Sequence, residues 1–206
     1  MNRKIKHELE RYFHDTFGVT PPETLIDPMV QHLDKAIMQH YFSEGGEWKP
    51  NYSKFTHTGW ALADRVNRMN PERVLDVGCG YNLFKDKIAN LWGIDPHNTR
   101  ADEMVGILDF QSDVQWDVVL CLGSINFGSA QKVMKELEKV VGLTKPGGSL
   151  FFRVNPGLQH DRAEAQWIDF FDWTPDWIHD TADFLGCRVT EIEPDQKRYY
   201  FRWIKR

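Results

Sequence analysis

Two aspartates, each at the end of a short apolar run, are the residues best placed to hold a ligand. The stretch VLDVGCGYNLFKDKIANLWGIDP, residues 74–96, carries Asp76 in the first run and Asp95 at the end of the second. Gly78 and Gly80 follow Asp76, and glycine lets the backbone approach a ligand with no side chain in the way. A glycine turn between two such runs is typical of a site for a nucleotide-type cofactor.

A dinucleotide matches this turn poorly. The GxGxxG fingerprint needs a third glycine for close packing of helix on strand, and the chain has Leu83 there. Asp76 would also bring a negative charge toward a pyrophosphate. The sequence therefore disfavours a dehydrogenase that uses a nicotinamide cofactor.

A cofactor with positive charge and no phosphate fits both aspartates better. S-adenosylmethionine carries a sulfonium and an ammonium group, which Asp76 would attract. Asp95 can accept hydrogen bonds from both hydroxyls of a ribose, and charge-assisted bidentate pairs are among the stronger hydrogen bonds. These two residues thus favour S-adenosylmethionine as the cofactor.

At these residues the sequence resembles the class I S-adenosylmethionine-dependent methyltransferases. The run DVGCG resembles their first motif, GIDP resembles the segment with their ribose-binding acid, and LTKPGGSLFF, residues 143–152, resembles the turn and strand after their fourth helix. The resemblance covers about residues 58–206. It implies, with the loop at 121–128, the cofactor-binding residues Asp76, Gly78, Cys79, Gly80, Asp95, Asp109, Phe110 and Leu122.

Short apolar runs alternate with helical patterns from residue 73 onward, which is typical of a mainly parallel sheet with helices on its faces. We expect helices at 83–90, 129–142 and 174–186, and strands at 73–77, 91–95, 105–110, 116–122, 149–155, 187–193 and 198–204. The family resemblance implies a Rossmann-like, seven-stranded mixed sheet in the order 3-2-1-4-5-7-6, with the last strand antiparallel. The short links around the third run require another element to cover that face of the sheet.

The first 57 residues form a separate helical cap in this interpretation, and residues 58–206 form the methyltransferase domain. Helical periodicity marks 5–13 and 27–42, and a third helical pattern follows at 57–69. The cap is the candidate lid over the site, through Tyr41, Trp48, Tyr52 and Phe55.

The loop CLGSINFG, residues 121–128, should face the transferred methyl group. Ser124, Asn126 and Phe127 resemble part of the [DNS]PP[YFW] motif of methyltransferases that act on planar amino groups, although both prolines are missing. These three residues and Trp173 are the substrate candidates. The alternative is that the loop only covers the methionine part of the cofactor.

Charge separates the possible acceptors. The net charge is −5, and residues 161–195 hold ten acids and two arginines among aromatic residues. A solvated acidic face over an aromatic core is the default interpretation of this segment. The alternative is that it borders the acceptor, which favours a flat or cationic small molecule. The basic tail KRYYFRWIKR, residues 197–206, fits an edge strand, or a contact with nucleic acid.

Composition limits the remaining classes. The 206 residues include three widely separated cysteines and eight histidines without HxxxH or HxH spacing, so we expect neither a disulfide framework nor a metal site. The chain shows no signal peptide and no membrane-spanning run, which favours a cytoplasmic protein. The prediction is methyl transfer from S-adenosylmethionine to an unidentified small molecule. A nucleic-acid methyltransferase and a non-catalytic cofactor-binding module are the alternatives.

Overall fold

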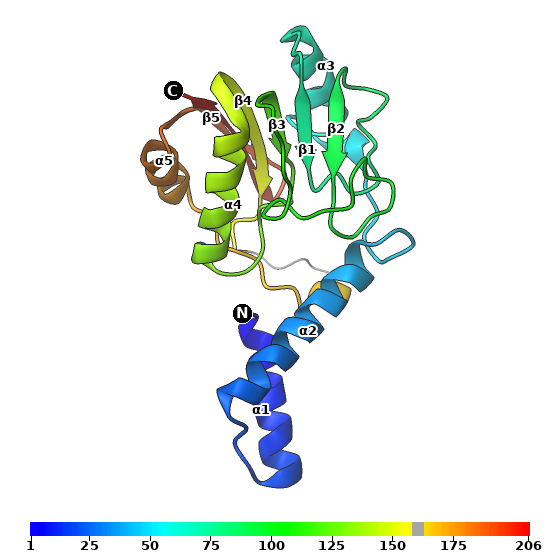
Figure 1. Ribbon diagram of the computed structural model, residues 1–206, viewed down its shortest axis with the longest axis vertical. Coiled ribbons are helices and arrows are strands. Elements are labelled where there is room, and N and C mark those ends of the chain that lie inside the picture. The colour runs from blue at the N-terminus through cyan, green and yellow to red at the C-terminus, as the bar shows by residue number, and fades with distance from the viewer. Residues whose placement is uncertain (158–162) are drawn as a thin grey trace.

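The computed structural model describes residues 1–157 and 163–206 and is built around one mixed sheet (Figure 1). Six helices and six strands matter for the site, besides the short helix at Ala163–Ala165. The helices are α1 (Arg3–Phe17), α2 (Glu23–Phe42), the 3-10 helix η1 (Tyr52–Lys54), α3 (Trp60–Arg68), α4 (Ala130–Leu143) and α5 (Pro175–Phe184). The strands are β1 (Val74–Val77), β2 (Leu91–Ile94), β3 (Trp116–Cys121), β4 (Thr144–Val154), β5 (Cys187–Asp195) and β6 (Arg198–Lys205).

The sheet has the order β2-β1-β3-β4-β6-β5. The first four strands in this order are parallel, and β6 is antiparallel to both β4 and β5. All four residues of β1 are buried, as expected of a parallel strand covered on both faces. The carboxyl ends of β1, β2, β3 and β4 therefore meet at one edge of the sheet.

The expected seven strands and their order are wrong, because residues 105–110 form no strand beside β2. The backbone N–H groups of Asp109 and Phe110 both donate to the carbonyl of Gly106, which closes a turn there. Ten residues separate Ile94 from Val105, whereas a parallel crossover needs about a dozen or more. Only an isolated bridge between Ile94 and Glu103 extends the pairing at this edge.

The helix expected at 83–90 is also absent, and residues 80–89 form a series of turns. This segment nevertheless covers one face of the sheet, since Phe84 and Ile88 pack in one cluster with Leu62 and Val66 of α3. The opposite face is covered by α4 and α5. The face that the short links leave open is thus covered by α3 and the turns.

The N-terminal helices form a hairpin that extends away from the sheet (Figure 1). Ile5 of α1 packs on Ile26 and Val30 of α2. The side-chain amide of Asn2 donates to Asp34 at 2.8 Å and to the carbonyl of Trp167 at 2.7 Å, which attaches the hairpin to the later part of the chain. The predicted boundary after residue 57 falls between η1 and α3 and stays a prediction.

We expected the basic tail to form an edge strand, and this expectation is wrong. Its strand β6 lies between β4 and β5, and β5 is the edge. Tyr200, Phe201 and Trp203 of β6 are buried, and the consecutive residues Tyr200 and Phe201 pack in the clusters on opposite faces of the sheet. This interior position explains why the basic residues of the tail alternate with aromatic and apolar ones.

Candidate active site

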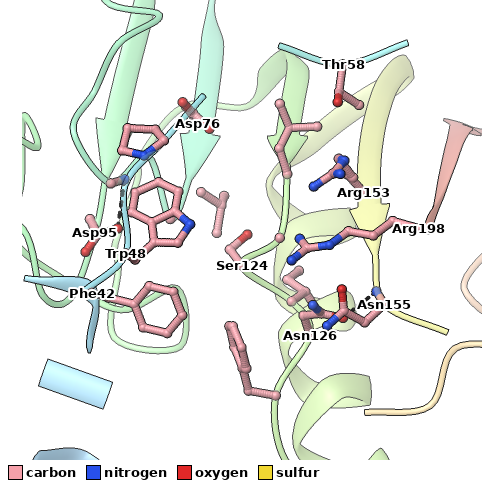
Figure 2. A pocket seen from close by; sticks show the side chains of 18 of the residues that line it. Phe42, Trp48, Thr58, Asp76, Asp95, Ser124, Asn126, Arg153, Asn155 and Arg198 are labelled. Atoms are coloured by element: carbon pink, nitrogen blue, oxygen red, sulfur yellow. Dashed lines mark hydrogen bonds between the residues drawn. The ribbon is translucent and has the colours of Figure 1, made fainter. Parts of the chain in front are cut away.

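A cavity of about 430 Å³ opens at the carboxyl ends of the parallel strands (Figure 2). This is the edge at which open α/β sheets bind their ligands, and the volume lies in the range of about 300–1,000 Å³ of small-molecule sites. Its walls come from the ends of α2, β1, β2, β3 and β4, from the segment 48–59, and from the start of β6. Figure 2 shows Asp76, Asp95 and Trp48 on one side, Arg153 and Arg198 on the other, and Ser124 between them.

The glycine turn after β1 forms part of the wall. Gly78 and Gly80 have φ angles of 70° and 55°, which side chains with a Cβ rarely adopt. A Cβ on Gly80 would lie 2.7 Å from the indole of Trp48, and a Cβ on Gly78 would collide with the Cβ of Ser124. Both glycines are therefore required for the turn itself as well as for ligand access.

Asp95 supports this turn through its carboxylate. It accepts hydrogen bonds from the backbone N–H of Gly80 at 2.9 Å, of His97 at 2.8 Å and of Asn98 at 2.9 Å. A carboxylate has about four acceptor positions. About one position is left for a ribose hydroxyl, fewer than the bidentate pair expected.

Asp76 is buried, and its Oδ2 has no hydrogen-bond partner among the described residues. Burial and the nearby carboxylate of Asp95 raise its pKa to about 7. A buried carboxylate without a cation is costly. A positively charged group bound in the cavity would remove this cost, so the site fits an ammonium group.

The expected adenine contacts are replaced by their neighbours. Asp109 is exposed, Phe110 is buried in the core, and neither lines the cavity. Val105, Gly106 and Ile107 line it instead. The turn at Gly106 thus brings a different part of the same segment to the site.

Glu136 of α4 also lines the cavity, and its Oε2 is buried without a partner among the described residues. Burial raises its pKa to about 7, while Lys132 at 3.7 Å opposes this rise. Burial also lowers the pKa of His97, and nearby Lys132 lowers it further. Glu136 is therefore a second buried acid with a raised pKa in the wall of the cavity.

The loop after β3 brings three of the four substrate candidates to the cavity. Ser124, Asn126 and Phe127 line it, together with Leu122. The Oδ1 of Asn126 accepts from the backbone N–H of Asn155 at 2.9 Å, whereas its Nδ2 and the Oγ of Ser124 are buried without partners among the described residues. This loop thus presents polar groups that a ligand can satisfy.

The arrangement is similar to that of solved methyltransferase structures. CalS10, an amino pentose methyltransferase from Micromonospora echinaspora bound to S-adenosylmethionine, aligns with a TM-score of 0.55 and 18% identity over 71% of this chain and 89% of that one. The 1,6-didemethyltoxoflavin-N1-methyltransferase of Burkholderia thailandensis, bound to its substrate and S-adenosylhomocysteine, aligns with a TM-score of 0.57 and 11% identity over 100% and 90%. The chain has the fold of the class I S-adenosylmethionine-dependent methyltransferases.

A third solved structure is also similar to the chain, whereas two other comparisons found no match. The sugar N-methyltransferase KedS8 from Streptoalloteichus sp. aligns with a TM-score of 0.52 and 16% identity over 70% of this chain and 86% of that one. No protein-family model matches the sequence, and no curated protein matches it. The resemblance found in the sequence is thus confirmed for the fold.

Besides Asp109 and Phe110, two further predicted residues lie away from the cavity. Trp173 is fully buried and packs edge-on against Trp177 at 4.8 Å in the core. Cys79 is buried in the glycine turn, where its Sγ lies 2.9 Å from the position of a Cβ on Gly93, on the side of β2. Neither side chain lines the cavity.

The acidic segment 161–195 does not border the cavity as expected. Of its described residues, only Phe170 is part of the cavity wall, while residues 161 and 162 lie outside the described part of the chain. Most of its acids belong to α5 and to β5 at the far edge of the sheet. The expectation of a cationic acceptor loses its basis.

The candidate lid is partly assembled over the cavity. Trp48, Tyr52 and Phe55 line it, whereas Tyr41 is buried behind Phe42, with their rings 4.8 Å apart. Burial raises the pKa of Tyr52, and the nearby Asp76 carboxylate raises it further. The segment after α2 thus covers part of the cavity.

Sequence reasoning missed Arg153, Asn155, Arg198 and Glu136. One signal was present for Glu136, because this acid interrupts the apolar stripe of Val133, Leu137 and Val140. Arg153 likewise interrupts the apolar run SLFFRVN. A charged residue in a buried run needs a partner or a ligand.

Among the described residues, no helix is long and apolar enough to cross a membrane. Nor does that part of the chain contain a group of three or more His, Cys, Asp or Glu side chains able to hold a metal ion.

Proposed function

We propose that the protein transfers a methyl group from S-adenosylmethionine to a small-molecule acceptor. The observation that carries the proposal is the buried Asp76 carboxylate, unpartnered among the described residues, directly beside a glycine turn at the switch point of the sheet. A dinucleotide pyrophosphate would be repelled there, whereas an ammonium group would be bound. The methyltransferase fold and neighbours crystallised with S-adenosylmethionine or S-adenosylhomocysteine support the same cofactor.

Each wall of the cavity has a separate task in this proposal. Asp76 would hold the ammonium group, Asp95 would accept from the ribose, and residues 105–107 would contact the adenine. When bound, S-adenosylmethionine supplies an activated methyl group on a sulfonium, which is already a good leaving group. Trp48 and Phe42 would keep water from that position.

Positioning of the acceptor is then the main task of the protein. The acceptor atom must lie about 3–3.5 Å from the methyl group and in line with the departing sulfur. Ser124 and Asn126 are near the centre of the cavity and have unsatisfied polar atoms that can orient it. The proposal requires no general base unless the acceptor must lose a proton.

A small-molecule acceptor is favoured by the shape of the site. The cavity extends past Ser124 to Arg153, which leaves space for an acceptor and supports an enzyme over a non-catalytic binding module. The amino pentose and toxoflavin enzymes with the same fold act on small molecules. A nucleic acid is disfavoured because Arg202 and Arg206 of the tail are engaged with Ser149 and Asp183.

Titration calorimetry with S-adenosylmethionine, S-adenosylhomocysteine, NAD and NADP tests the cofactor. We expect binding of the first two only, and loss of that binding in Asp76→Ala. Asp109→Ala is the matched control, because this carboxylate is exposed and lies outside the cavity. Binding of NAD, or unchanged binding by Asp76→Ala, would refute the assignment. Transfer of labelled methyl groups to a pool of metabolites tests turnover.

A further inference from the structure

The end of the cavity opposite Asp76 and Asp95 carries two guanidinium groups. Figure 2 shows Arg153 and Arg198 on that wall, with both guanidinium groups directed into the cavity. Arg153 comes from β4 and Arg198 from the first residue of β6, two strands that are neighbours in the sheet. Asp76 and Asp95 thus lie on the side that we assign to the cofactor, and the two arginines lie on the side that is left for the acceptor.

Arg153 is rigidly held in this position. It is 8% exposed, its Nε donates to the Oδ2 of Asp195 at 3.3 Å, and its guanidinium lies 3.9 Å from the ring centre of Phe55. Asp195 is fixed in turn by the hydroxyl of Thr58 at 2.6 Å. Because Asp195 is reached through Nε, the outer fork of the guanidinium can face the cavity. A planar guanidinium fork matches a carboxylate in geometry.

Arg198 lies beside the loop that follows β3. Its Nη1 is 3.5 Å from the position that a Cβ on Gly123 would occupy, next to Ser124. Burial lowers the pKa of Arg153 to about 10, and the neighbouring Arg198 contributes to this lowering. Two guanidinium groups therefore converge at one end of the cavity, where the carboxylate of Asp195 is close to both and raises the pKa of each. A carboxylate on a ligand would be attracted by the same two groups.

Neutral groups at the same end are also hydrogen-bond donors. The Nδ2 of Asn126 is an unpartnered donor among the described residues, in a side chain that is only 1% exposed. Its Oδ1 accepts from the backbone N–H of Asn155, which leaves the Nδ2 group to donate to a ligand. The unpartnered hydroxyl of Ser124 can donate as well. A carboxylate, which accepts hydrogen bonds, can satisfy both donors.

Aromatic rings line the cavity as well, with Phe55 at the guanidinium of Arg153 and Phe127 beside Phe42. Phe55, Phe127 and Phe170 line it, and the rings of Phe127 and Phe170 are 5.4 Å apart. We propose, given the methyltransferase function proposed above, that the acceptor is a small planar organic acid whose carboxylate is bound between Arg153 and Arg198. The carboxylate orients the acceptor, and the rings hold its planar part beside Ser124.

Four probes of equal ring size test this site on the protein saturated with S-adenosylhomocysteine: benzoate, benzamide, benzylamine and phenyl phosphate. Ligand-observed NMR titration measures the affinity of each probe. We expect benzoate to bind at least about tenfold more tightly than benzamide and benzylamine, because only the carboxylate forms charge-assisted hydrogen bonds with both arginines.

Variants identify the residues responsible. Arg198→Gln should weaken benzoate binding by about tenfold or more and leave S-adenosylhomocysteine binding unchanged. Arg202→Gln is the matched control, since this arginine is on the same strand, bonds to Ser149 and does not line the cavity. Asn126→Ala is a second variant, which removes the Nδ2 donor without changing the charge. This variant should bind benzoate more weakly than the wild type does.

The outcomes separate this site from the cofactor assignment. Failure to bind S-adenosylhomocysteine refutes the proposed function, while benzoate binding that depends on Arg198 would still support the anion site. Normal S-adenosylhomocysteine binding with no preference for benzoate over benzamide, including no binding of any probe, overturns the carboxylate proposal. Tighter binding of phenyl phosphate than of benzoate overturns it in favour of a phosphate ester. A methyl-transfer screen of organic acids against their amides gives an independent readout, in which the acids should be the acceptors.

Discussion

The carboxylate of Asp95 accepts a hydrogen bond of 2.9 Å from the backbone N–H of Gly80, fifteen residues earlier in the chain. The residue expected to contact the ribose is therefore also the support of the glycine turn. The ends of β1 and β2 are joined by this bond, and it places both aspartates on the same side of the cavity. A change at Asp95 will act on the cofactor directly and through the turn.

Asp95→Ala should weaken binding of S-adenosylhomocysteine by about 2 kcal/mol or more. The reason is the loss of a charge-assisted contact to the ribose together with the loss of the acceptor for Gly80, His97 and Asn98. Calorimetry on the folded variant measures the change, with Asp109→Ala as the control. Unchanged affinity would mean that the ribose lies elsewhere.

Cofactor affinity should depend on pH through Asp76. Its pKa is raised to about 7 in the unliganded protein, and an ammonium group binds only the ionised carboxylate. Below that pKa a proton must be released on binding, so affinity should fall by about tenfold between about pH 8 and about pH 6. Asp76→Asn should bind weakly at both pH values. A flat profile in the wild type would contradict the role of Asp76.

Asp76 should also reduce the stability of the unliganded protein. Its pKa is raised from 3.8 to about 7 on folding, so the folded state binds more protons than the unfolded state between these values. The free energy of unfolding therefore falls as the pH rises through this range. At about pH 8, Asp76→Asn should raise it by at least about 1 kcal/mol, and the gain should vanish below about pH 4. Chemical denaturation at both pH values measures the free energy of unfolding. A variant that is less stable than the wild type at the higher pH would contradict the prediction.

Gly78→Val should destabilise the fold as well as block the cofactor. Its φ is 70°, and a Cβ would collide with the Cβ of Ser124. We expect a loss of about 3 kcal/mol or more in the free energy of unfolding. Gly142→Ala in α4 is the control, because nothing lies within 4 Å of the new Cβ and alanine favours a helix. A variant with wild-type stability would show that the turn can rearrange.

Duplex DNA and tRNA should show no tight, salt-dependent binding. Lys205 donates to the carbonyls of Val141 at 2.9 Å and Thr144 at 2.8 Å, and Arg202 and Arg206 have partners within the domain. Titration at low and physiological salt measures this. Micromolar binding that falls steeply with salt, and that disappears when these three residues are neutralised together, would establish a nucleic-acid methyltransferase.

One part of the cavity wall could be predicted because its residues are close in the chain. Asp76, the glycines and Asp95 occur at the ends of adjacent strands, so local spacing determines where they meet. Asp109 could not be placed in the same way, since the short link after β2 leads into a turn closed on Gly106 and not into a strand at 105–110. The fold class was recoverable for the same local reason, whereas the number of strands was not.

The acceptor side depends on contacts between distant segments. Arg153 meets Asp195 across 42 residues, and both lie in runs that look like ordinary strands. Tryptophan is a residue type that often contacts ligands, yet Trp173 packs against α5 and the sheet and lies in the core. Net charge was also misleading, because the acidic segment faces away from the cavity while single arginines from β4 and β6 face into it.

The hairpin of α1 and α2 connects the wall of the cavity to a point far from the sheet. Met38 and Phe42, near one end of α2, belong to the cavity wall, and the other end of this 20-residue helix is at Glu23. A helix of that length spans about 30 Å, so a rotation of about 10° around Phe42 displaces the far end by about 5 Å. A small adjustment of the wall is thereby magnified at the outer tip. Fluorescent labels at the tip and on the sheet would register ligand entry as a change in distance.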